Sequence, residues 1–408
     1  MGQFARHHAL LVTGLGIFTA AAICELAGPP AKPATPAATT TTASAPSEEV
    51  VKRLAAALVA WWPGDDHTCD LVADNDLEPD KAMAYADGPA GRCFSLDSCR
   101  AVARKPKELK IGGPLSVSLW CRTDQKAKYP LAGMLSSMSP YGDGYRLHYG
   151  VEDKTVTFHT GRVDDGSAGV TKAQCADMWD NKWHHVVGTY EEGKTCIYID
   201  GQLCGTTRNK GIAYREDPVV IGCDAHHWHE GRYFKGEIDE VMIFNKALDA
   251  KHVLALRDLW LPRKMKLSEV EVAALLDDVR GGDAAKALMA MTRLSSAGKH
   301  EAAVRLAVSA DASPDIEALI RDLDADRWAV RDAATRKLKA QGRKVVLPLR
   351  QAMKNASPEA SQRITEILES LSTGRVSRAE ARLMTLVQRM PTTAPATAPT
   401  SGPVSASR

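Results

Sequence analysis

Short segments that alternate between apolar and polar residues fill the chain from about residue 58 to residue 260. They are rich in β-branched and aromatic residues, and Gly, Asp or Asn separates them. Alternation with period two predicts strands that bury one face, because successive side chains point to opposite faces of a sheet. Strands are predicted at residues 116–120, 145–149, 155–159, 185–190, 219–221 and 240–244. So many short strands in series predict an antiparallel sandwich or barrel.

Beyond residue 267 the apolar positions change to helical spacing. Ser268 and Glu271 form a capping box, so a helix is predicted to begin there. Ser357 precedes Pro358, which places a capping hydroxyl before a proline at the first helical position. Several short helices joined at this rhythm predict an all-α region of stacked helix pairs.

Both ends of the chain lack a pattern that could build a core. An uncharged apolar stretch at 9–23 follows Arg6 and is shorter than the roughly 20 residues that span a bilayer. It predicts a secretory signal peptide, or alternatively an N-terminal anchor, within residues 1–27. A Pro/Ala/Thr-rich linker follows at 28–49. We therefore expect a secreted or cell-envelope protein, with membrane attachment, if any, through the N-terminal segment only.

Composition and charge narrow the function. The 408 residues suffice for two or three domains. The 52 Lys and Arg residues nearly balance the 50 Asp and Glu residues, for a formal net charge of +2. A nucleic-acid-binding protein usually carries a strong basic field, so no nucleic-acid partner is expected.

Cysteine usage supports export. Of the nine cysteines, Cys24 lies in the predicted signal, and the other eight lie between Cys69 and Cys223. An even number confined to one segment of an exported chain predicts a disulfide-braced domain. Because no C-x-x-C pair occurs, a zinc site is disfavoured.

One disulfide can be predicted from local geometry. Asp200-Gly201 is a hairpin-turn signal between two short β-type runs. Folding the chain about this turn sets Cys196 opposite Cys204, at a separation typical of a disulfide. The other six cysteines could pair in fifteen ways, which stay open.

Four motifs carry a resemblance to a known family. They are LVAWWPGD at 58–65, WHHVVGTY at 183–190, IYIDG at 197–201 and FKGEIDEVMIFNKAL at 234–248. In this order they resemble the laminin G-like (LamG-like), concanavalin A-like jelly-roll family of secreted bacterial proteins. Residues 272–371 resemble the HEAT-like helical repeats of planctomycete-type exported proteins. The expected architecture is a multidomain chain: an all-β antiparallel jelly-roll sandwich at 50–261, an all-α HEAT-like domain at 262–373, and a helical extension with a disordered tail at 374–408.

The resemblance implies a recognition protein. Sandwiches of this family usually bind carbohydrate or another protein, and a HEAT-like domain would dock a protein partner. A glycoside hydrolase or lyase on the same fold is the alternative, and a structural envelope component is another. Enzyme relatives carry a Glu-x-Asp-x-x-Glu strand, which the run from Glu237 to Glu240 does not reproduce. Because nucleophile, phosphate and dinucleotide motifs are also missing, we expect a non-catalytic protein.

The resemblance also implies a calcium site. Asp70 and Asp239 match positions where related domains place calcium on the rim of the sandwich, and calcium prefers oxygen ligands. The alternative is structural: Asp70 would cap a turn, and Asp239 would accept hydrogen bonds from backbone amides.

Two loops are candidates for ligand binding. One holds Tyr141, and the other holds His226, His227 and Trp228, a composition suited to stacking on a sugar or holding a metal. Loops at sandwich ends often carry function, although an ordinary surface loop is the alternative.

Overall fold

The computed structural model describes residues 45–389 with short gaps. The gaps are 104–106, 126–130, 140, 151–154, 163–166, 175–177, 179, 209–210, 226–231, 264, 300–301, 305, 308–313 and 372–375. The predicted signal or anchor, nearly all of the linker and the final tail therefore lie outside the described residues. Within the described residues, no helix combines the length and apolar character needed to cross a membrane.

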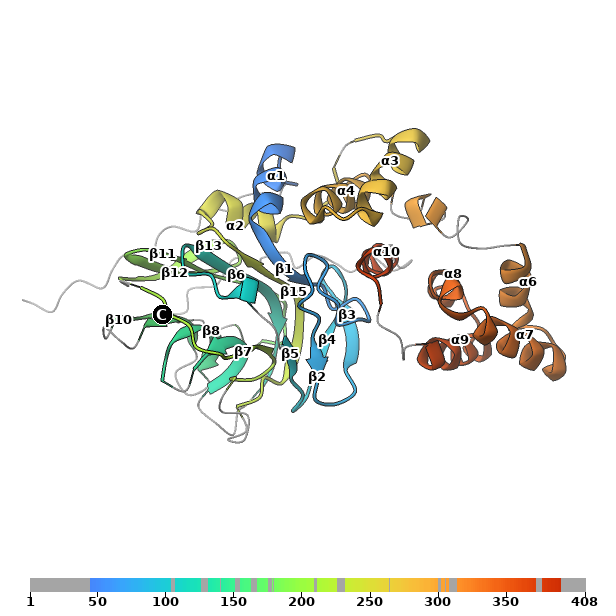
Figure 1. Ribbon diagram of the computed structural model, residues 1–408, viewed down its shortest axis with the longest axis horizontal. Helices are drawn as coiled ribbons and strands as arrows, with labels where there is room; N and C mark the ends of the chain where they lie inside the picture. The colour runs from blue at the N-terminus through green and yellow to red at the C-terminus, as the bar shows by residue number, and fades with distance from the viewer. Residues whose placement is uncertain are drawn as a thin grey trace, which may run out of the picture. The chain divides into compact units, whose positions relative to one another are not determined.

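Two antiparallel sheets form the β part (Figure 1). Sheet A contains, in spatial order, β13 (Gln202–Thr207), β12 (Lys194–Ile199), β11 (His184–Glu191), β6 (Leu115–Arg122), β15 (Gly236–Phe244), β4 (Gly91–Leu96) and β3 (Ala84–Gly88), and β1 (Leu58–Trp62) also pairs with β15. Sheet B contains β10 (Ser167–Gln174), β9 (Thr155–Arg162), β8 (Gly144–Gly150), β7 (Leu131–Met138), β14 (Val219–Ile221), β5 (Ala101–Ala103) and β2 (Glu78–Pro79). The predicted strands are confirmed, and so is the sandwich.

The main core lies between the sheets. Alternation sends Tyr145, Leu147 and Tyr149 of β8 inward, where they are fully buried. Gly188 on β11 faces the ring of Phe158 on β9, and a Cβ at Gly188 would overlap that ring. The glycine therefore permits close approach of the two sheets at this point.

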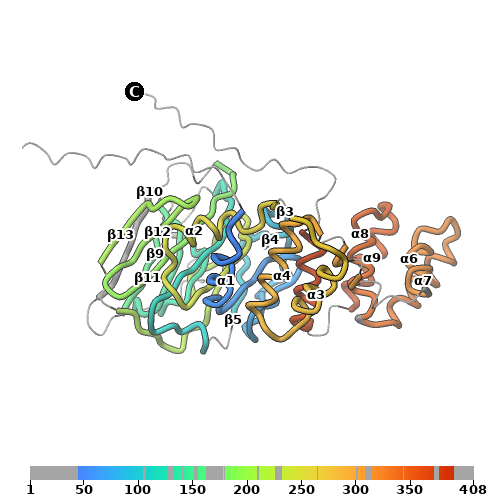
Figure 2. Tube along the Cα trace, turned by 90° about the horizontal axis from the view of Figure 1, so that it is seen from above, coloured from blue at the N-terminus to red at the C-terminus, as the bar shows by residue number. Residues whose placement is uncertain are grey.

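Helices cover the outer face of sheet A. Helix α1 (Glu48–Ala57) and helix α2 (Ala250–Arg257) contact each other, and α1 also contacts α4 (Ala284–Ser296) (Figures 1 and 2). Their apolar residues share a second core with Val187, Tyr198, Met242 and Phe244 of sheet A. The part of the outer face of sheet A that holds Val187, Tyr198, Met242 and Phe244 is thus buried by the chain itself.

The C-terminal part is helical. It contains α3 (Glu269–Arg280), α4, α6 (Pro314–Asp322), α7 (Trp328–Ala340), α8 (Val346–Met353), α9 (Pro358–Leu371) and α10 (Arg378–Gln388). The predicted capping box is confirmed, because the Ser268 hydroxyl and the Glu271 carboxylate cap each other's backbone amides. The Ser357 hydroxyl likewise accepts a hydrogen bond from the amide of Ala360. A sandwich followed by helices confirms the multidomain fold class, and the HEAT-like character stays a prediction.

Helix α10 contacts α3, α8 and strand β4. Every residue from Ala381 to Val387 is buried, which is unusual for a helix that carries an arginine in the middle. The buried Arg382 donates hydrogen bonds to the carbonyl oxygens of Leu71, Val279 and Gly281. The C-terminal helix is therefore an integral part of the packing around the sandwich.

The predicted Cys196–Cys204 disulfide is wrong in this structure. The hairpin turn is present, with positive φ at Asp200 and Gly201. However, a bulge between β12 and β13 shifts the register and sets Cys196 opposite Thr206. Cys204 is exposed, and its thiol donates to the carbonyl of Gln202. All described cysteines are free thiols, and Cys175 lies outside the described residues.

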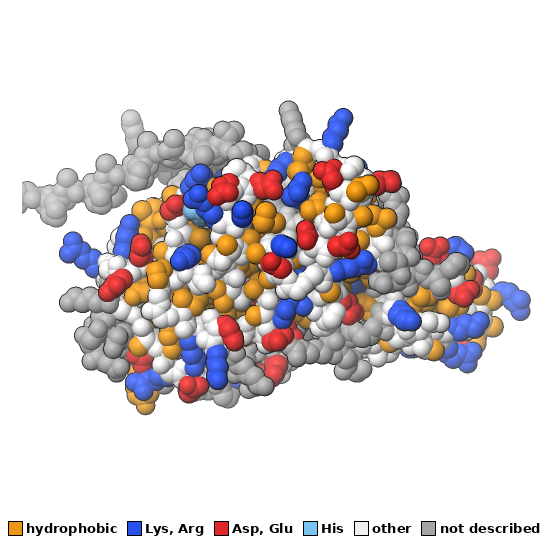
Figure 3. Space-filling model, turned by 45° about the horizontal axis from the view of Figure 1, so that its top comes forward, with side chains coloured by type: hydrophobic (Ala, Val, Ile, Leu, Met, Phe, Trp, Pro, Cys, Tyr) orange, Lys and Arg blue, Asp and Glu red, His pale blue; other side chains and the backbone are white. Residues whose placement is uncertain are grey.

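Charges of both signs intermingle on the face shown in Figure 3. No single-sign field dominates this face, which agrees with the near-zero net charge of the chain.

Candidate functional site

A polar row crosses the outer face of sheet B, the face that points away from the main core. The register pairs Ser136 of β7 with Arg146 of β8, and Arg146 with His159 of β9. Directly opposed residues on neighbouring antiparallel strands point to the same face, so the three side chains form one line. We call these residues the sheet B row.

The sheet B row retains unused hydrogen-bonding atoms. Ser136 Oγ, Arg146 Nε and His159 Nε2 are all buried and make no hydrogen bond in the structure. Other atoms of the row are engaged: Arg146 Nη1 lies 2.7 Å from Asp224 Oδ2, and Arg146 Nη2 lies 3.5 Å from His159 Nδ1. Buried polar atoms without partners are rare in native proteins, so they mark a place where a ligand or water supplies the missing bonds.

Electrostatics keep His159 neutral. Burial and the neighbouring Arg146 guanidinium lower its pKa to about 4, and Asp224 opposes part of this shift. At neutral pH the imidazole therefore offers one donor and one acceptor, and the guanidinium offers donors only. This set suits a hydroxyl-rich ligand.

The predicted ligand loop that holds Tyr141 borders the sheet B row. A Cβ at Gly161 would touch both the Gly142 carbonyl oxygen and His159 Nε2, so the loop that holds Tyr141 lies beside the histidine. Tyr141 is 67% exposed, and the Arg215 guanidinium lies 4.7 Å from its ring centroid. An exposed ring of this kind can stack on a sugar.

His226, His227 and Trp228 lie outside the described residues, but the residues that flank their loop do not. Asp224 stands before it and Arg232 after it, and the Asp224 amide donates to the Arg232 carbonyl. Asp224 also accepts from Arg146, so the residue that precedes this loop contacts the sheet B row. The ligand-binding role of Tyr141, His226, His227 and Trp228 stays a prediction.

The described strands of sheet B carry no carboxylate pair. The single acidic residue on these strands is Glu78, in β2 at the edge of the sheet. Glycoside hydrolysis needs two carboxyl groups across the scissile bond, commonly about 5–10 Å apart. The described strands of this face therefore do not supply the usual hydrolytic pair.

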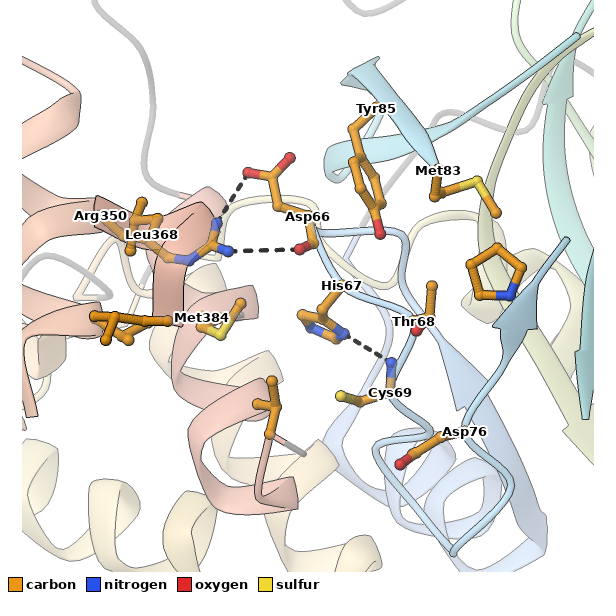
Figure 4. A pocket seen from close by; sticks show the side chains of 14 residues that line it. Asp66, His67, Thr68, Cys69, Asp76, Met83, Tyr85, Arg350, Leu368 and Met384 are labelled. Carbon is orange, nitrogen blue, oxygen red and sulfur yellow. Dashed lines mark hydrogen bonds and ion pairs between the residues drawn. The ribbon is translucent and has the colours of Figure 1, made fainter. Parts of the chain in front are cut away.

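A cavity of about 400 Å³ lies elsewhere, at the loop that follows β1 (Figure 4). Arg350 reaches from α8 to the carboxylate and carbonyl oxygens of Asp66. His67 accepts from the Cys69 amide and contacts the Thr385 hydroxyl, and burial lowers its pKa to about 3. Because Asp66, His67 and Arg350 already have partners within the chain, this cavity offers less to a polar ligand than the sheet B row.

Asp70 and Asp239, the predicted calcium ligands, have separate partners. Asp70 accepts hydrogen bonds from the amides of Trp61 and Val72 and from the Asn75 side chain. Asp239 accepts from the amides of Ala90 and Glu240. Within the described residues, no group of three or more His, Cys, Asp and Glu side chains is placed to hold a metal ion. The two carboxylates do not fit a shared calcium site, and calcium binding stays a prediction.

Sequence reasoning missed Arg146, His159 and Asp224. The alternation in β8 and β9 places Arg146 and His159 away from the core, but it does not show which strands are neighbours. The sequence does contain a signal for Arg146 and His159, because each is a basic side chain in a strand whose other face is apolar.

Comparisons with known proteins agree with the fold. Residues 100–254 match the family model described as the concanavalin A-like lectin/glucanases superfamily. No curated protein gives a significant match.

Among solved structures, the chain is similar to the binding domain of Paraclostridial Mosquitocidal Protein 1, with 16% identity and a TM-score of 0.43, over 52% of this chain and 55% of that chain. It is also similar to domain 4 of AbnA, a GH43 extracellular arabinanase from Geobacillus stearothermophilus solved with arabinotriose, with 19% identity and a TM-score of 0.40, over 49% of this chain and 98% of that one. A third similar structure is the botulinum neurotoxin serotype D/C binding domain, with 16% identity and a TM-score of 0.41, over 50% and 52%. The chain thus spans about half the length of these toxin domains.

Proposed function

We propose that this protein is a non-catalytic, extracytoplasmic recognition protein that binds carbohydrate through the outer face of sheet B. The observation that carries the proposal is the sheet B row, where Ser136, Arg146 and His159 present buried hydrogen-bonding atoms without partners. Sugar hydroxyls donate and accept at once, so they match a mixture of hydroxyl, imidazole and guanidinium groups. Tyr141 adds an exposed ring at the border.

The arrangement of helices supports the same face by elimination. Sheet A packs Val187, Tyr198, Met242 and Phe244 of its outer face against the helices, so a ligand cannot reach this part of the face without displacing them. The helical part carries the exposed Trp328 on α7. We propose that this helical part docks a protein partner. Secretion or attachment to the cell envelope belongs to the proposal as well, supported by the N-terminal sequence.

A glycan and polysaccharide binding screen on the full chain tests the proposal. It is run once with excess calcium and once with chelator, so that the calcium prediction is tested too. For a glycan that binds, Arg146→Met should weaken the affinity roughly 10- to 100-fold, because a charge-assisted hydrogen bond is lost. Arg122→Met is the matched control: Arg122 also pairs with a carboxylate, Glu237 at 3.1 Å, but from sheet A.

A second pair of variants keeps the proposal testable if Arg146→Met does not fold. Tyr141→Ala removes an exposed ring, and Trp328→Ala removes another exposed ring on the helical part. Weaker binding in the first variant with unchanged binding in the second supports the proposal. Equal effects of Arg146→Met and Arg122→Met, or binding to no glycan in either condition, would contradict it. Release of new reducing ends from any bound polysaccharide would favour the hydrolase instead.

A further inference from the structure

Three carboxylates of the sandwich are buried together at the end of α10. Asp65, in the loop after β1, is 0% exposed, as is Asp239, and Glu240 is 4% exposed. Burial raises the pKa of each carboxyl group, and repulsion within the cluster raises the pKa values of Asp65 and Asp239 further. Buried carboxylates are stable only if they are paired or protonated. We call these three residues the carboxylate cluster.

A β-bulge places two cluster members on the same side of the sheet. In a regular strand, Asp239 and Glu240 would point to opposite faces. The register of β15 against β6 shifts between Asp239 and Met242, and Glu240 adopts a φ of 52°. A positive φ is costly for a residue other than glycine, and such strain tends to persist where function requires it. Here the strained bulge brings the carboxylates of Asp239 and Glu240 together.

The cation that meets the carboxylate cluster is Arg389, which caps the C-terminal end of α10. Its guanidinium forms a close ion pair with Glu240, and Nη2 lies 3.7 Å from Asp65 Oδ2. Asp65 Oδ2 is buried and makes no hydrogen bond, so the ionic contact with Arg389 stabilises its charge. The charge of Asp65 also acts on Lys354, where it opposes the lowering of the pKa by burial.

Two indoles complete the surroundings of Arg389. The guanidinium carbon lies 3.8 Å from the ring centroid of Trp260 and 5.5 Å from that of Trp61. The two rings stack on each other, with centroids 5.7 Å apart. Trp260 Nε1 also donates to Glu240 Oε2 at 2.9 Å, which orients the carboxylate toward the arginine. Carboxylates beside aromatic faces suit a planar guanidinium.

We propose that the carboxylate cluster is a cation-binding site whose ligand is the protein's own Arg389. The resemblance to LamG-like domains leads one to expect a calcium ion beside Asp239. Calcium needs six to eight oxygen ligands, whereas this site replaces part of such a shell with two indole rings. The C-terminal helix thereby supplies in cis the positive charge that a metal ion would bring, and it ties the end of the chain to the sandwich.

A double-variant cycle on the full chain tests the proposal. Arg389→Met should lower the melting midpoint by on the order of 10 °C, because it leaves buried carboxylates without their cation. Adding Glu240→Gln should recover part of that loss, since one negative charge disappears with the positive one. Arg378→Met is the matched control on the same helix: Arg378 pairs with the exposed Asp74 and should shift the midpoint little.

Additive effects of Arg389→Met and Glu240→Gln would overturn the proposal, because they would show no coupling between the cation and the cluster. If Arg389→Met yields no folded protein, the double variant decides: it folds if charge balance is the cause, and failure of both would overturn the proposal. Calcium alone supplies a second readout. The wild-type midpoint should be the same in 1 mM calcium chloride as in chelator, on the order of concentrations that weak calcium modules need. A calcium-dependent rise that disappears in Asp239→Asn would place a metal at this site and overturn the proposal.

Discussion

Replacing Arg382 by methionine tests how strongly the C-terminal helix is tied to the sandwich. Arg382 is 1% exposed in the middle of α10. Its guanidinium donates to the carbonyl oxygen of Leu71 at 2.7 Å, of Gly281 at 2.7 Å and of Val279 at 3.3 Å. These carbonyls belong to the loop after β1 and to the end of α3, so one side chain links helix α10 to two other segments. Methionine keeps most of the apolar stem and removes only the polar fork.

The size of the effect follows from the hydrogen bonds. A hydrogen bond to a charged group contributes roughly 1.5–3 kcal/mol, and an acceptor left buried without a partner costs roughly 1–3 kcal/mol. Part of this loss is recovered, because the variant no longer buries a charge. Burial lowers the pKa of Arg382 to about 10, and Arg378 contributes to the shift, which shows that the charged form is penalised. We therefore expect the free energy of unfolding to fall by about 3–5 kcal/mol.

Urea denaturation followed by circular dichroism measures this change. The control is Arg336→Met on α7, because Arg336 is 74% exposed and pairs with Asp332 at 3.2 Å. Exposed ion pairs contribute roughly 0–1 kcal/mol, so the control should unfold almost as the wild type does. If Arg382→Met also unfolds within about 0.5 kcal/mol of the control, well below the expected loss, the reasoning about these carbonyl contacts is refuted.

Three further predictions concern the β part. Gly161→Ala should lower the free energy of unfolding by roughly 1–3 kcal/mol in urea denaturation, because its Cβ would overlap the Gly142 carbonyl oxygen. Burial lowers the pKa of His184, but its bonds to Asp200 outweigh burial, so the net pKa is raised. The stabilisation of the folded state by this pair is therefore complete below the unfolded-state pKa of about 6.5, and it is lost as pH rises through the raised value. Asp200→Asn should thus lower the melting midpoint more at pH 5.5 than at pH 8.5. In the native protein, maleimide should label Cys204 before any other described cysteine, because it is the exposed one.

Each of these predictions has a control or a contrary result. Gly112→Ala introduces a Cβ into open space, so it should leave the stability nearly unchanged. A midpoint loss in Asp200→Asn that is independent of pH would show that the charge on the histidine does not matter. If maleimide labels Cys204 only after reduction, Cys204 forms a disulfide, which would contradict the free thiol of the structure.

The sequence predicts most strands and several helix starts because both depend on local patterns. Alternation reveals β8 and β9, and the Ser268 capping box fixes the start of α3. The hairpin at Asp200 was equally visible, but the bulge that displaces Cys204 was not. A bulge inserts a residue to satisfy the twist and packing of the whole sheet, so a count along the sequence from the turn does not detect it.

The functional residues were harder to predict because they depend on strand neighbours and distant segments. Asp239 and Glu240 lie in a motif that the sequence had singled out, yet alternation assigns them to opposite faces. Arg389 lies 149 residues beyond Glu240, at the end of a short helix before a Pro/Thr-rich tail. Nothing in its local sequence distinguishes it from an ordinary exposed arginine, since the contact arises only when α10 packs against the sandwich.

Arginines meet different partners on the two sides of the sandwich. Arg389 meets a carboxylate cluster and two indoles, and Arg382 meets three carbonyls, so the sheet A side binds its own chain. Arg146, on the sheet B side, has an ion pair with Asp224 but keeps Nε without a partner, next to His159 with Nε2 also unused. The sheet A side therefore holds its arginines in contacts within the chain, and the sheet B row remains the proposed ligand surface. Variants of the sheet B row should thus change binding, and variants of the carboxylate cluster should change stability.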